Sequence, residues 1–303
     1  MLSVVIPTYL REAELLNTIQ LLLTQSKAPA EILVIDQSPD HEPETNHALD
    51  EYVRKSLIRW IRLNEPSIPK SMNLGLNEAI SPVVLFLDDD IAAGNNLIEA
   101  HLMAHLKGGG LTAVAGQVLQ PGEVPQDVNV GWCRSGLQAD LELPFFSRRG
   151  DWIANVMAGN LSVDRAFALR IGGFDESFIG VAYRFETEFA RRMIKHCGKI
   201  WFCPEASINH LRAARGGTRA TGSHLKSADP KYGIGDYYFA FLHGEGWESW
   251  SYSFRRAIRE IRTKFHLSHP WWIPVKLLGE VRAFLAGWKL ANKKKRLRAE
   301  GEK

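Results

Sequence analysis

The sequence has few cysteines, no long apolar run and no strong excess of charge. Its 303 residues include three cysteines, an odd number without a close pairing pattern, which indicates free thiols in a reducing compartment. Nowhere do ~18 apolar residues follow one another, as a membrane-spanning helix would require. The opening MLSVVIPTYL has no basic segment ahead of a long apolar stretch, which argues against a secretory signal. We therefore predict a cytoplasmic protein.

The charges are unevenly placed along the chain. The formal net charge is +3, but residues 251–303 contain fourteen Lys or Arg against four Glu, a local balance of +10, which leaves −7 for residues 1–250. A general nucleic-acid-binding protein would carry a basic face on its folded body, so no nucleic-acid partner is expected. The pattern instead leaves room for a cation in the body and for an anionic surface against the tail.

Strand-like and helix-like segments alternate from the start of the chain. The strands are continuous apolar runs, and such runs separated by helices indicate an α/β fold with a mostly parallel sheet covered on both faces. The predicted strands are 2–9, 31–38, 57–63, 83–90, 111–119 and 199–204, and the predicted helices are 14–26, 44–55, 70–80, 96–106 and 185–196.

Polar side chains end three of these strands, at 8–9, 36–38 and 88–90. Because ligands bind beyond the carboxyl ends of strands in such sheets, the three clusters predict one binding site. The last cluster consists of three adjacent aspartates, which cannot be buried without positive partners. Hard carboxylate oxygens suit Mg²⁺ or Mn²⁺, whereas the alternative is a helix N-cap at Asp90 with its neighbours solvated. The position of the triplet at a buried strand end favours the metal site.

Several motifs follow one another in the order of a known family. They are VVIPTYLR (4–11), EILVIDQS (31–38), IPKSMNLGLNEA (68–79), VVLFLDDDI (83–91), MAGNLSVDR (157–165), IGGFDESF (171–178), YRFETEFARR (183–192) and INHLRAARGGTR (208–219). Over about residues 1–220 the chain therefore resembles the family 2 glycosyltransferases. This resemblance implies the GT-A fold with its Rossmann-like sheet, a nucleoside-diphosphate sugar donor, Mn²⁺ or Mg²⁺ as cofactor, and inversion at the anomeric carbon.

The resemblance also implies roles for individual residues. Asp90 would bind the metal directly, Asp88 would lie at the metal and the ribose, and His210 would complete the metal shell. Glu186 would be the general base for the acceptor hydroxyl, although a solvated helix face is the alternative for this side chain. The donor-binding candidates are Pro7, Thr8, Tyr9, Asp36, Lys70, Asn73, Asp88 and Asp89, the acceptor-side candidate is Asn160, and the candidates for closing over the phosphates are Arg215 and Arg219.

Some positions depart from the family's usual pattern. Leu10 stands where Asn is frequent, Gln37 where a second Asp is common, and Met72 where an Arg often precedes the Asn. Phe185–Glu186 replaces the usual Glu–Asp pair. These departures leave the contacts to base and phosphate open, and with them the identity of the nucleotide.

The resemblance fades beyond about residue 226. Five of the nine tryptophans lie after residue 245, among many lysines and arginines, and the chain runs through WWIPVKLLGEVRAFLAGWKL into NKKKRLR. A basic amphipathic helix with Trp at its margins suits an anionic membrane surface. The alternative is a helix that packs on the protein and ends in a solvated basic tail.

These observations predict a GT-A catalytic domain over residues 1–225 and a basic, Trp-rich, helical extension over residues 226–303. The predicted function is transfer of a sugar, with a UDP-sugar as the first candidate donor, to a glycan or lipid-linked glycan of the cell envelope. The protein would be cytoplasmic or peripheral on the inner face of the cytoplasmic membrane. The alternatives are a non-catalytic sugar- or partner-binding protein on the same fold and a sugar nucleotidyltransferase, although VVIPTYLREAE lacks the Gly-rich phosphate loop that the latter needs.

Overall fold

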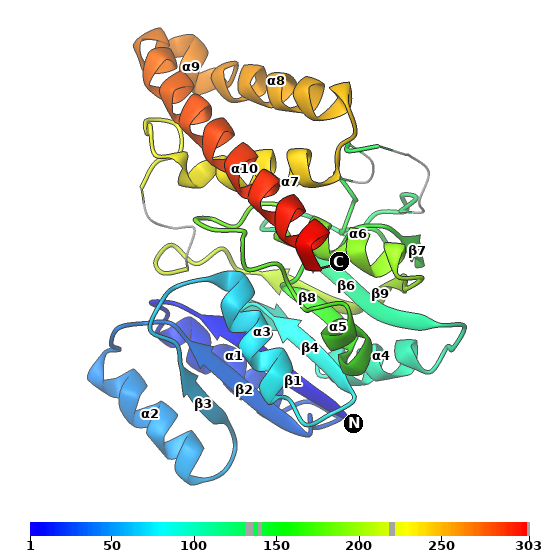
Figure 1. Ribbon diagram of the computed structural model, residues 1–303. Helices are drawn as coiled ribbons and strands as arrows, with labels where there is room; N and C mark the ends of the chain where they lie inside the picture. The colour runs from blue at the N-terminus through cyan, green and yellow to red at the C-terminus, as the bar shows by residue number, and fades with distance from the viewer. Residues whose placement is uncertain (131–135, 139–140, 218–221, 302–303) are drawn as a thin grey trace. The chain divides into compact units, whose positions relative to one another are not determined.

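The computed structural model of the chain describes residues 1–130, 136–138, 141–217 and 222–301 (Figure 1). The chain divides into two compact units. The first comprises Met1–Trp132, Asp140–Phe174 and Phe189–Ala220, and the second comprises Cys133–Ala139, Asp175–Glu188 and Thr221–Lys303. Because these units interleave along the chain, the division into domains 1–225 and 226–303 stays a prediction.

The first unit is built on a mixed sheet. Within the described residues this sheet has nine strands in the order β3-β2-β1-β4-β8-β6-β9-β5, and β7 pairs with β9. The strands are β1 (Leu2–Thr8), β2 (Glu31–Asp36), β3 (Arg59–Arg62), β4 (Val83–Leu87), β5 (Ile91–Ala93), β6 (Leu111–Leu119), β7 (Asp151–Ile153), β8 (Asn160–Asp164) and β9 (Lys199–His210). The strands β3, β2, β1 and β4 pair in parallel, which accounts for their continuous apolar runs. β8 then runs antiparallel between β4 and β6, and β9 is parallel to β6. The predicted α/β fold is confirmed.

Helices lie against the sheet of the first unit, and a glycine sets how closely one of them approaches. Before residue 221 the helices are α1 (Ala13–Leu23), α2 (Pro43–Arg54), α3 (Ile68–Glu78), α4 (Leu97–His105), α5 (Arg165–Arg170) and α6 (Phe185–Lys195). On β1, Val4 and Ile6 are buried in one core cluster with Leu15 of α1, whereas Val5 contacts α3. A Cβ on Gly75 would collide with the Val5 side chain, so α3 needs a glycine at this point to lie so near the strand.

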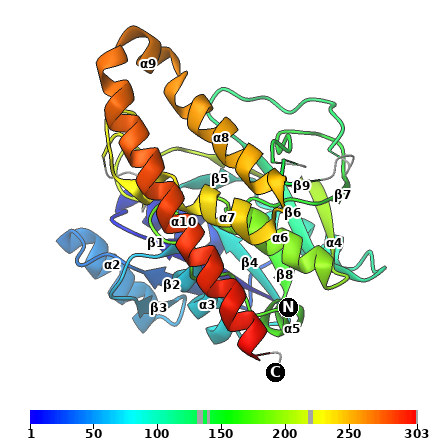
Figure 2. The same cartoon turned by 45° about the horizontal axis from the view of Figure 1, so that its top comes forward.

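The C-terminal part of the second unit is helical, as predicted. It contains α7 (Ile234–His243), α8 (Trp247–Ile261), α9 (Lys264–Ser268) and α10 (Ile273–Gly301), with short 3-10 turns at Pro230–Tyr232 and Pro270–Trp272. Both α8 and α10 pack on α7, and they form the two arms of a V that meet near α9 (Figure 2). Among the helices in the described ranges, none is long and apolar enough to cross a membrane.

A buried charge network holds the second unit together around Asp236 of α7. The Asp236 carboxylate is completely buried and accepts hydrogen bonds from the Tyr252 hydroxyl at 2.7 Å and from Arg184 Nε at 3.0 Å, and it also pairs with Arg256. Burial alone would raise the pKa of Asp236, but the two arginines outweigh burial and lower it. Because an uncompensated charge in this position would be costly, the network ties α7 to α8 and to the segment around Arg184.

Candidate functional site

The aspartate triplet lies between two strands rather than at the start of a helix. It directly follows β4, and β5 begins at the next residue, Ile91, which pairs with His210 at the end of β9. The next helix, α4, begins only at Leu97, so the alternative of a helix N-cap at Asp90 is wrong. The pairing of β5 with β9 places His210 beside the triplet.

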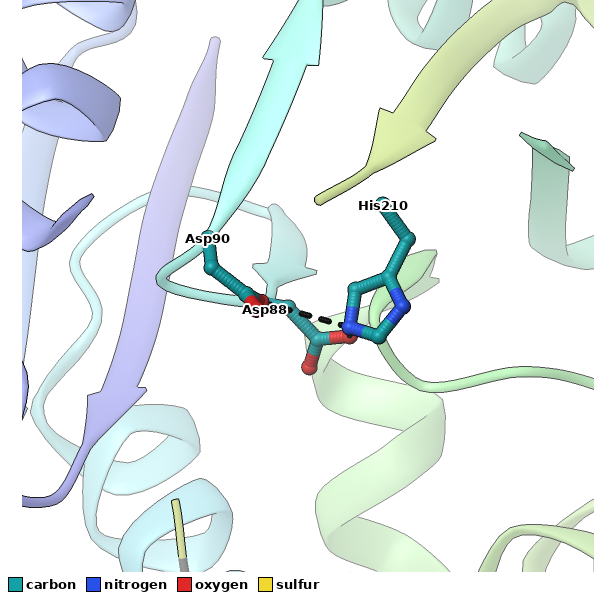
Figure 3. A group of neighbouring side chains, drawn as sticks. All are labelled: Asp88, Asp90 and His210. Carbon is teal, nitrogen blue, oxygen red and sulfur yellow. Dashed lines mark ion pairs between the residues drawn. The ribbon is translucent and has the colours of Figure 1, made fainter. Parts of the chain in front are cut away.

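Asp88, Asp90 and His210 form a group of possible metal ligands (Figure 3). One ligand atom from each lies within 4.8 Å of the others. The Nε2 atom of His210 is 3.2 Å from Asp90 Oδ1 and 3.8 Å from Asp88 Oδ2. Octahedral Mn²⁺ or Mg²⁺, with ligands at ~2.1 Å, brings neighbouring ligand atoms to roughly 3 Å from one another, so small side-chain shifts suffice. The side chains of Asp88 and His210 are 48% and 24% exposed, against 2% for Asp90, so the group is open to solvent on one side. The donor set and its spacing fit a divalent cation.

Asp90 is the most firmly held member of the group. Its Oδ2 atom accepts a hydrogen bond from the Ala213 backbone N–H at 2.8 Å and one from Arg11 at 3.2 Å, while Oδ1 faces His210. Burial would raise the pKa of Asp90, but the hydrogen bonds from His210 and Ala213 and the charges of His210 and Arg11 lower it. Asp90 therefore presents an ionised, fixed carboxylate.

Asp89 faces the protein interior, away from the group. Its Oδ2 atom accepts a hydrogen bond from Thr8 Oγ1 at 2.7 Å, and its Oδ1 atom lies 3.3 Å from Arg11 Nε as an ion pair without hydrogen-bond alignment. The Thr18 hydroxyl donates to the Asp89 carbonyl at 2.9 Å. Burial raises the pKa of Asp89 to about 7, against the lowering effects of Thr8 and Arg11. Asp89 thus fixes the triplet to β1 and α1, and its predicted contact with the donor stays a prediction.

Arg11 is the functional residue that sequence reasoning missed. Besides its two aspartate partners, it donates a hydrogen bond to the Arg215 carbonyl. The Gly217 backbone N–H donates to the Tyr9 carbonyl at 2.7 Å, and a Cβ on Gly216 would collide with the backbone of Leu10. The segment after β9 is therefore fastened to the turn after β1. The position of Arg11 in VVIPTYLR, directly after the first polar strand end, was the available signal.

Gly159 sets the position of Asp88. The Asp88 backbone N–H donates to the Gly159 carbonyl at 3.2 Å, and a Cβ on Gly159 would overlap the Asp88 carboxylate. Gly159 is buried at the start of β8, the antiparallel neighbour of β4. The glycine therefore leaves the space in which the carboxylate lies.

Asp36 is enclosed by protein partners at the end of β2. Its carboxylate is fully buried and accepts hydrogen bonds from Trp60 Nε1 and Arg62, each at 3.0 Å, and from the Ser38 N–H at 2.8 Å, while His41 Nε2 lies 3.0 Å away. Burial would raise the pKa of Asp36, but the hydrogen bonds from His41 and Ser38 and the charge of His41 lower it. In this conformation Asp36 organises the strand end, and its role in donor binding stays a prediction.

Other donor-side candidates, and Gln37 among the departures from the family pattern, also serve the fold. Gln37 donates to the Thr8 carbonyl at 3.2 Å and accepts from the Ser67 N–H at 2.6 Å, so it joins β1 to the start of α3. Asn73 exchanges two hydrogen bonds with the backbone of Phe174, at 2.9 and 2.7 Å. The Lys70 ammonium lies 2.9 Å from Glu65. Pro7 and Tyr9 are half-buried, so both retain accessible surface at the end of β1.

The remaining candidates differ in accessibility. Asn160 is completely buried, and its amide donates to the carbonyls of Gln117 and Ala206 and faces His101, so its acceptor-side role stays a prediction. In the first turn of α6, Glu188 is fully buried, whereas Glu186 is only half-buried.

The structure describes only one of the two arginines predicted to close over the phosphates. The Arg215 side chain is exposed, and Arg219 lies outside the described residues.

The sequence is similar to known proteins over this region. The profile of Glycosyl transferase family 2 matches residues 3–159, more than half of the chain. Validoxylamine A glucosyltransferase of Streptomyces hygroscopicus subsp. limoneus is 26% identical over 208 residues, which are 59% of this chain and 45% of that protein. The chain thus spans less than half the length of this curated relative.

Solved structures share the fold. GalNAc-T7 with UDP, GalNAc and Mn²⁺ matches 84% of this chain and 54% of its own at a TM-score of 0.58 and 15% identity. Mannosyltransferase PcManGT from Pyrobaculum calidifontis, in complex with GDP-Man and Mn²⁺, matches 100% of this chain and 80% of its own at a TM-score of 0.53 and 16% identity. TarS of S. aureus matches at a TM-score of 0.55 and 14% identity, over 86% of this chain and 43% of its own.

Proposed function

This chain belongs to glycosyltransferase family 2, and on that premise we propose that it transfers a sugar from a nucleoside-diphosphate donor to a hydroxyl group of an acceptor. The observation that carries the proposal is the group of Asp88, Asp90 and His210 at the carboxyl end of β4. Its oxygen and nitrogen donors suit Mn²⁺ or Mg²⁺. A bound ion of this kind supplies positive charge for the diphosphate that leaves the sugar.

The chain's own residues prepare this site before any donor arrives. Arg11 and the Ala213 N–H fix the Asp90 carboxylate, and Gly159 leaves the space for Asp88. A preorganised group of this kind needs little rearrangement when charge develops. Lys70 and Arg215 carry the positive charges that we assign to the phosphates.

We assign the general base to Glu186. The acceptor hydroxyl must lose its proton as it attacks the anomeric carbon, and a positioned carboxylate contributes ~10²–10⁴-fold by accepting it. Glu186 is half-buried in the first turn of α6, whereas its neighbour Glu188 is inaccessible. Attack on the face opposite the leaving diphosphate inverts the anomeric carbon.

For the donor we propose a UDP-sugar, and for the acceptor a glycan or lipid-linked glycan of the cell envelope. GalNAc-T7 was solved with UDP and PcManGT with GDP-Man, so related folds accept both kinds of nucleotide. An acceptor on a lipid would explain a basic, Trp-rich C-terminal segment, and we propose a peripheral location on the cytoplasmic membrane.

Nucleotide binding in the presence of a metal ion tests the proposal most directly. We expect titration calorimetry to show uptake of UDP with Mn²⁺ and much weaker uptake without it, and Asp90→Asn to remove the metal-dependent part. Asp50→Asn, an exposed change in α2, is the control. If the folded wild-type protein took up neither UDP nor GDP with Mn²⁺, the proposal would be refuted.

A second experiment tests the general base. A screen of nucleotide-sugar hydrolysis with Mn²⁺ identifies the donor, since donor hydrolysis proceeds slowly without an acceptor. Glu186→Gln should then keep donor binding but reduce transfer by ~10²–10⁴-fold. Glu44→Gln, also in the first turn of a helix and exposed, is the matched control. Unchanged transfer by Glu186→Gln would remove Glu186 from the mechanism.

A further inference from the structure

Helix α10 turns its large apolar side chains outward. Leu277, Leu278, Val281, Leu285 and Trp288 are all exposed, from 38% to 54%. At 100° per residue they fall within about 100° of arc, so they form one continuous stripe along the helix. An ordinary amphipathic helix of a globular protein buries such a stripe.

The inward face of α10 carries small residues instead. Gly279, Ala283, Gly287 and Ala291 are buried, and a Cβ on Gly287 would collide with the backbone of Tyr238 in α7. These residues let α10 pack closely on α7, where Tyr237 and Ile234 form a small core with Ala283. None of the stripe residues belongs to this small core, within the part of the chain that the structure describes.

Exposed apolar side chains also occur on α8, on α9 and in the turn that follows it. Trp247, Trp250 and Phe254 are exposed at the spacing of one helical face, and Trp250 reaches Phe284 of α10 with ring centroids 5.7 Å apart. Near α9, Leu267 and Trp271 are 69% and 66% exposed. Both arms of the V thus carry exposed aromatic or aliphatic side chains.

Basic residues border this surface. On α10, Arg282, Lys289 and Lys293 are exposed and lie within the ~60° of arc beyond the apolar stripe. The only acid between residues 273 and 299 is Glu280, which is buried and paired with Lys276 at 3.0 Å. Over residues 273–299 the exposed charges of this helix are therefore all positive, and the exposed Glu300 follows near its end.

We infer that α8, α9 and α10 form a docking surface for an anionic phospholipid bilayer, with the apolar stripe at the headgroup–acyl boundary and the basic residues at the lipid phosphates. Trp and aliphatic side chains beside Lys and Arg are the composition of interfacial membrane helices. A second copy of the chain would bring another segment of balance +10 against the first, so charge disfavours self-association through this surface. The inference deepens the peripheral location proposed above and rests on it.

Vesicle co-sedimentation of the full chain tests the inference. We expect binding to phosphatidylcholine vesicles that contain phosphatidylglycerol, weak binding to pure phosphatidylcholine, and loss of binding as NaCl rises from about 0.05 M to about 0.5 M. Arg282→Gln/Lys289→Gln should weaken binding about 30-fold at low salt, from about five-fold per basic residue. Val281→Ser/Leu285→Ser should weaken it at least about ten-fold.

Matched controls carry the same changes on the first unit. Lys27→Gln/Arg54→Gln removes two exposed charges there, and Leu106→Ser/Val124→Ser removes two exposed apolar side chains. Both controls should bind vesicles as the wild type does.

The inference would be overturned if the wild type did not bind anionic vesicles at low salt, or if the α10 variants bound them as well as the wild type does. It would also be overturned if the wild type formed oligomers and the α10 variants were monomeric but still bound vesicles. Donor hydrolysis in vesicle-free solution is measured in parallel. If it fails while vesicles are bound, the proposed function fails and the membrane surface stands.

Discussion

The substitution Gly159→Ala adds one methyl group beside Asp88 and so tests the geometry of the group formed by Asp88, Asp90 and His210. A Cβ at this position would occupy the space of the Asp88 carboxylate. The Asp88 side chain is 48% exposed, so it can rotate toward solvent and relieve the overlap at little cost to the fold. We therefore expect the free energy of unfolding to change by no more than about 1 kcal/mol, as for changes without a buried clash.

The expected loss is in metal affinity. Changes that displace a ligand without removing it cost ~10–100-fold in affinity, which equals about 1.4–2.7 kcal/mol. Mn²⁺ titration by electron paramagnetic resonance, with urea unfolding of the same samples, measures both quantities. Asp88→Asn sets the lower limit of affinity, and Gly94→Ala is the matched control because its Cβ would meet only Asn96 Oδ1, at 3.0 Å. If folded Gly159→Ala bound Mn²⁺ as tightly as the wild type, Asp88 would not be a ligand in the way we propose.

Two further predictions concern charged residues near the site. Arg11→Gln removes the buried guanidinium that pairs with the ionised Asp90 carboxylate and with Asp89, and it should cost about 3 kcal/mol in urea unfolding. The exposed control Arg54→Gln should cost less than about 0.5 kcal/mol, and equal costs would contradict the ion pairs. For His41, burial lowers the pKa, but the hydrogen bonds and charges of Asp36 and Glu12 outweigh burial and raise it above 6.5. The stabilisation of the fold by protonated His41 is therefore fully present below the unfolded-state pKa of His41 and is lost as pH rises through its folded-state pKa. His41→Asn should cost about 1–2 kcal/mol at about pH 6 and less at about pH 9, and a cost that does not fall with pH would show that the charge of His41 is not involved.

The sequence predicted the parts of the fold that local pattern determines. The apolar run of β4 and the three aspartates after it placed a polar site at a strand end, and the parallel strands β1, β2 and β4 brought the other polar ends to the same edge. What the pattern could not show is pairing between distant segments. The three residues of β5 are a strand only because β9 pairs with them, and for that reason a helix N-cap at Asp90 was an open alternative.

Arg11 shows the same limit at the level of side chains. Its partners Asp89, Asp90 and Arg215 lie about 80 and 200 residues further along the chain, so their contact depends on how the whole first unit folds. Asn160 and Asp36 show the converse. Their residue types suited a ligand site, but the structure gives their polar atoms partners inside the protein. A motif identifies which residue types stand at a position, whereas burial shows which atoms remain accessible.

The join between the β1 turn and the segment after β9 also sets when the group of Asp88, Asp90 and His210 is complete. Asp90 receives its supporting groups from Arg11 near the start of the chain and from His210 and Ala213 some two hundred residues later. During synthesis, a growing polypeptide can complete this group only after Gly217 has left the ribosomal exit tunnel. A chain that terminated before that point would lack the groups that hold Asp90 from the end of β9.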